Sequence, residues 1–161
     1  MIVVGAGQIS MAIARRIGYN KKIIFGDYKF QNAENICEIM NNAGFDCIPF
    51  EMDLSDRNSI KSMLTEAQKY GEIEMLVNGA GVSPSQASIE QILKVDLYGT
   101  AVLLEEVGKV IMNGGTGVTI SSQSGKRMPQ LTPEEDRLLA CTPTEELLSL
   151  EILQPQNIEN T

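Results

Sequence analysis

The first residues of the chain combine a short apolar run, a turn with two glycines and an amphipathic segment, and this succession restricts the fold more than any other feature. Residues 2–4 are apolar, Gly5 and Gly7 follow, and apolar side chains recur at helical spacing through residues 9–17. The apolar period therefore changes at the glycines from that of a strand to that of a helix. Gly5 and Gly7 are two of the three glycines of a dinucleotide-binding turn, and Ser10 stands where the third would be. Gly5 permits a tight bend, and Gly7 lets the backbone approach a pyrophosphate at the helix N-terminus.

The alternation of apolar strand and amphipathic helix continues along the chain. Further strands are expected at residues 22–25, 47–50, 74–78 and 118–121, and a long helix at residues 89–111, with a loop at residues 113–115. Ser55 is expected to cap the third helix. Five strands that alternate with four helices predict right-handed βαβ units, and so an α/β fold with a doubly wound, Rossmann-like parallel sheet. Helices cover both faces of this sheet, which is incomplete because no sixth strand follows.

We expect one folded unit, because 161 residues with 43% hydrophobic side chains are enough for one core. Residues 1–125 form the predicted dinucleotide-binding, Rossmann-like unit, and residues 126–161 are predicted to be an inserted helical loop or a truncated tail. In this second part, Thr132 and Thr142 each precede a proline and are followed after three residues by a glutamate. This pattern is typical of a capping box, and it predicts two short helices.

The charge balance narrows the possible partners. The chain has 13 lysines and arginines against 21 aspartates and glutamates, so its formal net charge is -8. This charge argues against binding to nucleic acid or to an anionic membrane surface, and it leaves small-molecule or protein partners. Apolar runs are too short for a membrane span and the first residues lack the basic region of a secretory signal, so we expect a cytoplasmic protein.

The absence of histidine excludes several kinds of chemistry. Without it the chain cannot use a Ser-His-Asp or Cys-His mechanism, and most zinc-hydrolase sites are excluded as well. Cys37, Cys47 and Cys141 are odd in number and widely spaced. This pattern fits reduced thiols, most simply small core side chains, better than disulfides or a zinc site. No metal site is therefore expected.

Asp27 ends the second predicted strand and lies 20 residues after Gly7. At this place a carboxylate accepts hydrogen bonds from the adenosine ribose of NAD, whereas its simplest structural role would be to cap the next helix. The agreement of turn, spacing and strand end favours the ribose role and NAD(H) as the cofactor. Lys29 could instead contact a 2′-phosphate, so NADP(H) stays open.

Further motifs follow the strands in order: Gly5-x-Gly7, Asp27, Asp53-Leu54, Asn78-Gly79-Ala80-Gly81 and Ile120-Ser121-Ser122-x-x-Gly125. Together they resemble the short-chain dehydrogenase/reductase superfamily over residues 1–125. The resemblance implies that Asp53 and Leu54 hold the edge of the adenine, and that Asn78, Ala80 and Gly81 brace the sheet beside the cofactor. Gly79 replaces the second asparagine of the family's Asn-Asn-Ala-Gly motif. Gln8 and Ile9, in the opening turn, are further expected cofactor contacts.

The same resemblance assigns catalytic roles to Ser122 and Asp96. Ser122 matches the serine that orients the substrate carbonyl or hydroxyl, although Ser121, Ser122 and Ser124 could simply satisfy a polar loop. Asp96 aligns with the family's helix asparagine, which fixes a water in the proton relay. Capping of a neighbouring backbone is an equal alternative for this carboxylate.

The Tyr-x-x-x-Lys pair with which this family exchanges a proton is absent. The tyrosines are Tyr19, Tyr28, Tyr70 and Tyr98, and none follows the fifth predicted strand or has a lysine four residues on. We therefore expect the cofactor-binding portion of an NAD(P)-dependent oxidoreductase of a small-molecule alcohol or ketone, inactive alone and homo-oligomeric at full length. Either a long insertion displaces the pair or the chain is catalytically incomplete. The alternatives are a non-catalytic dinucleotide-binding module or sensor, and a fragment too short to fold stably.

Overall fold

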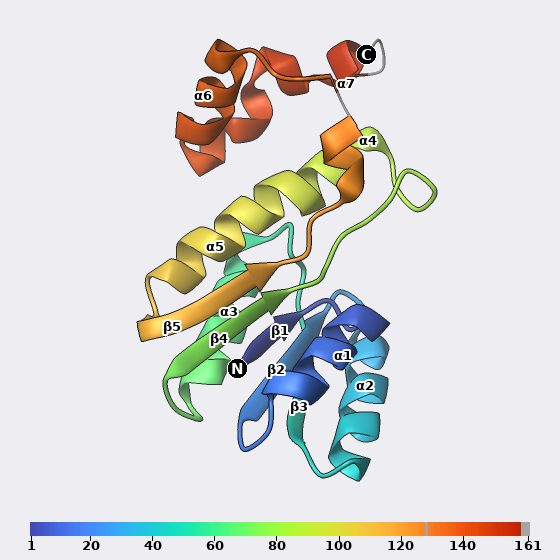
Figure 1. Cartoon of the computed structure of the whole chain (residues 1–161), viewed down its shortest axis with the longest axis vertical. Helices are drawn as coiled ribbons and strands as arrows, with labels where there is room; N and C mark the ends of the chain where they lie inside the picture. The colour runs from blue at the N-terminus through green and yellow to red at the C-terminus, as the bar shows by residue number, and fades with distance from the viewer. Residues whose placement is uncertain (128, 159–161) are drawn as a thin grey trace.

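The computed structural model of the chain describes residues 1–127 and 129–158. Its sheet has five parallel strands in the order β3-β2-β1-β4-β5 (Figure 1). The strands are β1 (Ile2–Val4), β2 (Lys22–Asp27), β3 (Asp46–Glu51), β4 (Ile73–Asn78) and β5 (Ile111–Thr119). The strand order and the parallel pairing confirm the predicted α/β fold with a doubly wound, Rossmann-like sheet.

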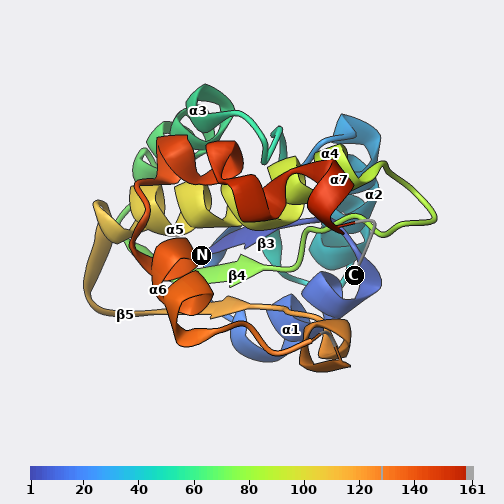
Figure 2. The same ribbon diagram turned by 90° about the horizontal axis from the view of Figure 1, so that it is seen from above.

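Helices join these strands and cover both faces of the sheet. They are α1 (Gln8–Ile17), α2 (Phe30–Asn42), α3 (Arg57–Gln68) and a composite helix of α4 (Ile89–Ile92), the π-helical segment η1 (Leu93–Gly99) and α5 (Thr100–Gly108). One core lies under α1 and α2, and a second core lies under α3 and α5. Figure 2 shows α3 and α5 on the opposite side of the strands from α1. Both faces are thus covered, which is typical of a parallel sheet.

The central strand β1 is buried on both faces. Ile2 and Val4 pack in the core under α3 and α5, whereas Val3 packs in the core under α1 and α2. Because successive side chains of a strand point to opposite faces, a strand in this place needs an uninterrupted apolar run. Burial of each such side chain stabilises the fold by about 1.5–3 kcal/mol.

Strand β5 is one of the two outer strands of the sheet, and most of its residues are exposed. Val118 pairs in register with Val77, a buried residue of the core under α1 and α2. Val118 nevertheless keeps 43% of its surface exposed. In the part of the chain that the structure describes, the sheet therefore ends in a strand with an open edge and a partly open face.

The composite helix ends earlier than predicted. α5 stops at Gly108 instead of residue 111, and β5 begins at Ile111 instead of residue 118. The apolar residues 110–112 fit a helix and a strand equally well by their periodicity. The pairing of Ile111 with Ile73 of β4, which a local pattern does not reveal, selects the strand.

The expected loop at residues 113–115 lies inside β5, so that prediction is also wrong. The register with β4 shifts there, because Ile73 pairs with Ile111 but Met75 already pairs with Thr116. The extra residues form a bulge, and its glycine at position 114 has a φ of +81°, a conformation that most residues avoid. The glycines that indicated a loop instead make this irregular strand possible.

The N-cap of α3 is Asp56 and not Ser55 as predicted. The Asp56 carboxylate accepts a hydrogen bond from the Asn58 N–H at 2.9 Å. Ser55 is engaged elsewhere, because its N–H and its hydroxyl both donate to Asp53 Oδ1, at 2.8 and 2.7 Å. Two adjacent residues are suitable caps, and the contact with Asp53 decides between them.

A series of short helical segments follows β5. They are η2 (Gln123–Arg127), α6 (Pro133–Cys141), η3 (Thr144–Ser149), η4 (Glu151–Leu153) and α7 (Pro155–Ile158). Thr132 and Glu135 form the predicted capping box of α6. The second predicted box is wrong, because Thr142 ends α6, where its N–H donates to the Leu138 carbonyl at 3.1 Å. η3 starts after Pro143 instead.

The division of the chain at residue 125 stays a prediction, and residues 128 and 159–161 of its second part lie outside the described residues. Within this second part, Leu147 of η3 is buried, and Glu145 contacts the first part. Among residues 1–127 and 129–158, no helix has the length and apolar character that crossing a bilayer requires.

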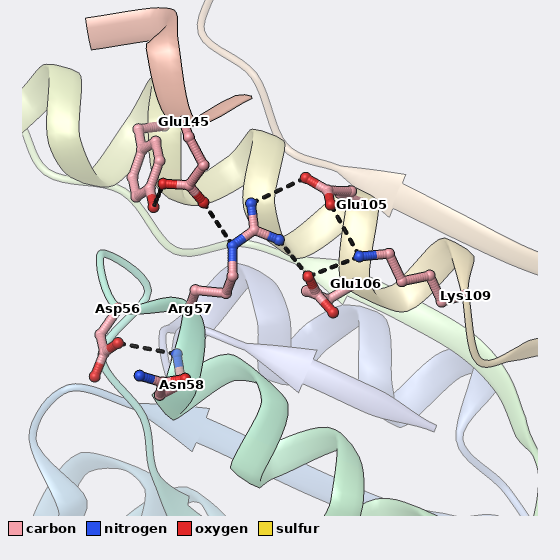
Figure 3. A network of polar contacts seen from close by, with 8 residues as sticks. Asp56, Arg57, Asn58, Glu105, Glu106, Lys109 and Glu145 are labelled. Atoms are coloured by element: carbon pink, nitrogen blue, oxygen red, sulfur yellow. Dashed lines mark hydrogen bonds and ion pairs between the residues drawn. The ribbon is translucent and has the colours of Figure 1, made fainter. Parts of the chain in front are cut away.

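A network of charged side chains attaches η3 to α3 and α5 (Figure 3). Arg57 donates to Glu145 at 2.7 Å, to Glu105 at 3.0 Å and to Glu106. Lys109 donates to both Glu105 and Glu106 at 2.9 Å. Glu106 is nearly buried, so these cations balance a carboxylate that would be costly there alone.

Substitution of Arg57 by glutamine should make stability less sensitive to acid. The hydrogen bond from Arg57 is the largest cause that lowers the pKa of Glu105 from 4.5 to about 2. A carboxyl with a depressed pKa contributes stability above its unfolded pKa and loses it as the pH falls through its folded pKa. The wild-type chain should therefore lose stability between pH 4.5 and about 2, and Arg57→Gln should lose less. Urea unfolding across this range measures the slope, with the exposed Lys94→Gln as control. Equal slopes in wild type and Arg57→Gln would contradict the prediction.

Candidate functional site

Backbone hydrogen bonds fix the loops that follow the strands at one edge of the sheet. In each of them a backbone N–H donates to a carbonyl of the neighbouring strand at 2.8 or 2.9 Å. The pairs, donor first, are Met52 and Asp27, Gly5 and Gly26, Gly79 and Val4, and Ile120 and Asn78. These contacts extend the parallel pairing beyond the strand ends. We name this region, where the carboxyl ends of the parallel strands meet, the carboxyl edge. In a doubly wound sheet it is the place where ligands bind.

The turn between β1 and α1 has the geometry that its glycines predict. Gly5 has a φ of +86°, and a Cβ atom there would lie 2.6 Å from the backbone nitrogen of Ala80. Gly7 is the N-cap of α1, and a Cβ atom there would meet no described atom within 4 Å outside its chain neighbours. Gly5 is therefore needed for the bend and for the approach of two loops, whereas Gly7 leaves open space at the helix N-terminus.

The N-terminus of α1 presents backbone N–H groups to this space. Within the described residues no side chain caps it, and no acidic residue stands in its first turn. Gln8 and Ile9 form the start of the helix and are exposed, Ile9 by 62% of its surface. Free N–H groups and the helix dipole favour an anion at such an end, so a phosphate group fits here.

Asp27 connects the end of β2 to this turn. Its carboxylate accepts hydrogen bonds from the Ala6 N–H at 2.8 Å, the Lys29 N–H at 2.9 Å and the Asn32 side chain at 3.1 Å. The structural alternative for Asp27, capping of the next helix, is not observed, because Lys29 is the N-cap of α2 and no side chain caps it. A carboxylate has about four acceptor positions, so about one remains for a ligand hydroxyl. Asp27 lies beside the turn, and its contact with a ribose stays a prediction.

Asp53 and Leu54 lie between β3 and α3. The Asp53 N–H donates to Ser59 Oγ at 2.9 Å, and its carboxylate is bound by Ser55. Leu54 is only 5% exposed, and its carbonyl oxygen would lie 2.5 Å from a Cβ atom on Gly99 of η1. Leu54 therefore offers little side-chain surface to a ligand, and the adenine contact of this pair stays a prediction.

Asn78 braces the carboxyl edge from inside. It is 1% exposed, its side-chain amide donates to Thr100 Oγ1 at 3.2 Å, and its Oδ1 accepts from the Ala80 N–H at 3.3 Å. These contacts join β4, the loop after it and α5. Thr100 is a contact that the motifs do not predict, although its place four residues after Asp96 puts both on one face of a helix.

Asp96, in η1, contacts the loop after β4. Its Oδ1 accepts a hydrogen bond from the Val82 N–H at 2.9 Å, and a Cβ atom on Gly81 would lie 3.4 Å from the same oxygen. Burial raises the pKa of Asp96, and the hydrogen bond from Val82 lowers it in part. The structure thus contains the capping contact, whereas a role in a proton relay stays a prediction.

Ser122 follows β5 at the same edge of the sheet and is exposed. Its hydroxyl oxygen accepts a hydrogen bond from the Ser124 N–H at 3.1 Å. A hydroxyl that accepts in this way keeps its own proton to donate to a substrate oxygen. The structure is therefore compatible with the orienting role and with the polar-loop alternative.

Tyr98 of η1 is a poor substitute for the missing catalytic tyrosine. Its hydroxyl donates to Glu145 at 3.1 Å. Burial raises the pKa of Tyr98, and the neighbouring Glu145 raises it further. A tyrosine that exchanges a proton with substrate near neutral pH needs a lowered pKa.

Comparison with protein families identifies the class to which the chain belongs. The family profile described as short chain dehydrogenase matches residues 1–133. The chain therefore belongs to the short-chain dehydrogenase/reductase family, as its motifs predict. This family of oxidoreductases binds NAD(P).

Two curated relatives illustrate the likeness. The chain is 34% identical over 155 residues to the short-chain dehydrogenase/reductase bsc3 of Alternaria brassicicola, covering 96% of this chain and 57% of that protein. It is 29% identical over 140 residues to the 7alpha-hydroxysteroid dehydrogenase of Bacteroides fragilis, covering 78% of this chain and 54% of that protein. The chain thus spans about half the length of the curated relatives it matches.

Solved structures show the same fold at low identity. A short-chain dehydrogenase/reductase from Serratia marcescens matches with a TM-score of 0.69 and 20% identity, over 90% of this chain and 66% of that chain. A putative D-mannonate oxidoreductase from Haemophilus influenza with bound NAD matches with a TM-score of 0.65 and 17% identity, over 74% and 53%.

Alanine substitutions at the two glycines of the turn should have different effects on stability. Gly5→Ala should lower the free energy of unfolding by about 2 kcal/mol or more, because the positive φ is strained and the Cβ atom meets Ala80. Gly7→Ala should cost about 1 kcal/mol or less, since its only defect is a poorer N-cap. Urea unfolding followed by circular dichroism compares the two, and equal losses would contradict the geometry of the turn.

Proposed function

We propose that the carboxyl edge binds NAD(P), and that the chain is the cofactor-binding part of an oxidoreductase that interconverts an alcohol and a ketone. The observation that carries this proposal is the uncapped N-terminus of α1, with open space at Gly7 and the Asp27 carboxylate beside the turn. An anion-binding helix end next to a hydroxyl acceptor fits the pyrophosphate and the ribose of a dinucleotide. The hydroxysteroid dehydrogenase relative and the NAD-containing structural neighbour support the same class of reaction.

Several parts of the carboxyl edge would hold the cofactor. The first N–H groups of α1 would bind the pyrophosphate, and the cofactor would cover the exposed Ile9 side chain. Asp27 would accept a hydrogen bond from the adenosine ribose. The remaining expected contacts are Gln8 in the opening turn, Asp53 and Leu54 on the adenosine side, and Asn78, Ala80 and Gly81 from the loop after β4.

We propose NAD(H) rather than NADP(H) as the preferred cofactor. Asp27 accepts hydrogen bonds, which suits a ribose hydroxyl, and its negative charge would repel a 2′-phosphate at the same place. The exposed Lys29 could offset part of this repulsion. The preference is therefore one of degree, and it depends on a single carboxylate.

When bound, the cofactor supplies the hydride chemistry, and the chain would orient the substrate. Ser122 would donate its proton to the substrate oxygen while it accepts from Ser124. The proton exchanged in the reaction needs a separate acid or base. Asp96 aligns with a family asparagine that fixes a water, and Tyr98 has a raised pKa, so we propose neither for this role. We therefore propose that the chain alone is inactive.

Asp27→Ala should weaken NAD binding about tenfold or more, because a hydrogen bond to a charged group is lost. NADP binding should weaken less, since the repulsion of its 2′-phosphate is lost at the same time. Calorimetric titration with each dinucleotide measures both affinities. Asp46→Ala, an exposed carboxylate at the opposite end of the sheet, is the matched control and should change neither. Equal losses for NAD and NADP would remove Asp27 from the ribose role.

The chain should show no turnover with alcohols or ketones, even at saturating NAD or NADH. A positioned general acid or base contributes about 10²–10⁴ in rate, and no suitable group is present among the residues described at the carboxyl edge. Nicotinamide absorbance over a panel of substrates provides the assay, with Ser122→Ala as the comparison. Turnover that disappears in Ser122→Ala would show that the described residues supply a proton relay, and it would contradict the proposal of inactivity.

A further inference from the structure

Two departures of this chain from the family pattern lie side by side in the structure. Ser10 stands at the third glycine of the turn motif, and Gly79 stands at the second asparagine of the motif after β4. A Cβ atom added to Gly79 would lie 2.2 Å from the Oγ atom of Ser10. Such a distance is far below ordinary contact, so position 79 cannot gain a side chain unless Ser10 moves or loses its hydroxyl.

Gly79 is not required by its backbone conformation. The described glycines with positive φ are Gly5, Gly44, Gly71 and Gly114, and Gly79 is not among them. Its N–H donates to the Val4 carbonyl at 2.8 Å, so the pairing with β1 fixes its backbone. Other residues can adopt this conformation. The space taken by Ser10 is therefore the structural reason for a glycine here.

The Ser10 side chain is fixed by burial and not by hydrogen bonding. Ser10 is 1% exposed, and its Oγ has no hydrogen-bond partner among the described residues. A buried hydroxyl without a partner costs free energy, so a hydrogen bond does not explain the serine. Its hydroxyl instead fills the space between the first turn of α1 and the loop after β4.

We infer that Ser10 and Gly79 form a matched pair that sets the distance between the first turn of α1 and the loop after β4. Gly5 approaches the same loop at Ala80, so two close contacts hold this loop. The functional consequence rests on the proposed function, in which α1 binds the pyrophosphate and the loop supports the cofactor from the other side. Ser10 is then a positioning residue for the cofactor, although it does not need to touch it.

Gly79→Ala tests the pair, and Ser10→Ala provides the rescue. The added Cβ atom would meet Ser10 Oγ at 2.2 Å but Ser10 Cβ at 3.6 Å, which is an ordinary contact. Gly79→Ala should lower the melting temperature by about 5 °C and weaken NADH binding about tenfold. Ser10→Ala alone should weaken NADH binding about threefold, because the hydroxyl that sets the spacing is lost. The double variant should recover most of both losses.

Calorimetric melting and NADH fluorescence titration give the two readouts. Gly108→Ala, where a Cβ atom meets open space, is the matched control and should combine additively with Ser10→Ala. The proposed pairing of Ser10 with Gly79 is contradicted if Gly79→Ala changes neither the melting temperature nor the NADH affinity, or if Ser10→Ala does not relieve its effect. If the pair is coupled in melting temperature but NADH affinity does not change, the positioning role is contradicted. A wild-type chain that does not bind NADH contradicts the proposed function instead. The melting temperatures of the variants then still test the contact between Ser10 and Gly79.

Discussion

The rest of the structure depends on the hydrogen bonds with which each strand continues into its loop. Because the strands are parallel, the N–H groups of Gly5, Gly79 and Ile120 still find carbonyl partners on the neighbouring strands after the strands themselves have ended. The chain leaves the sheet only after this additional pairing. The first residues of these loops are therefore held in place by the same kind of backbone pairing as the strands.

Local periodicity predicts the sheet because burial on both faces requires apolar runs, and such runs are visible in the sequence. Local patterns fail where two neighbouring residues suit the same role, or where one segment suits two kinds of element, equally well. Ser55 and Asp56 are both good N-caps, and the choice depends on Asp53, which binds Ser55. The start of β5 differs from the prediction for a related reason, since residues 110–112 suit either element and only the pairing of Ile111 with Ile73 of β4 selects the strand.

The sequence predicts which residues of the candidate site lie near one another, but it does not predict their hydrogen-bond partners. Asp27 and Asn78 end their strands, and a parallel sheet brings strand ends to one edge, so their nearness to the turn follows from their order in the chain. The hydrogen bonds of Asp27 with Ala6 and of Asn78 with Thr100 depend on how closely helices and loops approach one another. The contact of Ser10 with its neighbour requires the register between β1 and β4, which the sequence does not display.

The bulge in β5 affects how the open side of the sheet meets other polypeptides. An edge strand exposes unpaired backbone donors and acceptors, and a long regular edge is a template for unlimited addition of further strands. In β5 the regular pairing with β4 resumes only at Thr116 and continues to Thr119. The irregular turn at Gly114 interrupts the row of backbone groups before this stretch. The regular part of this edge is therefore short, and it offers few backbone donors and acceptors to a further strand.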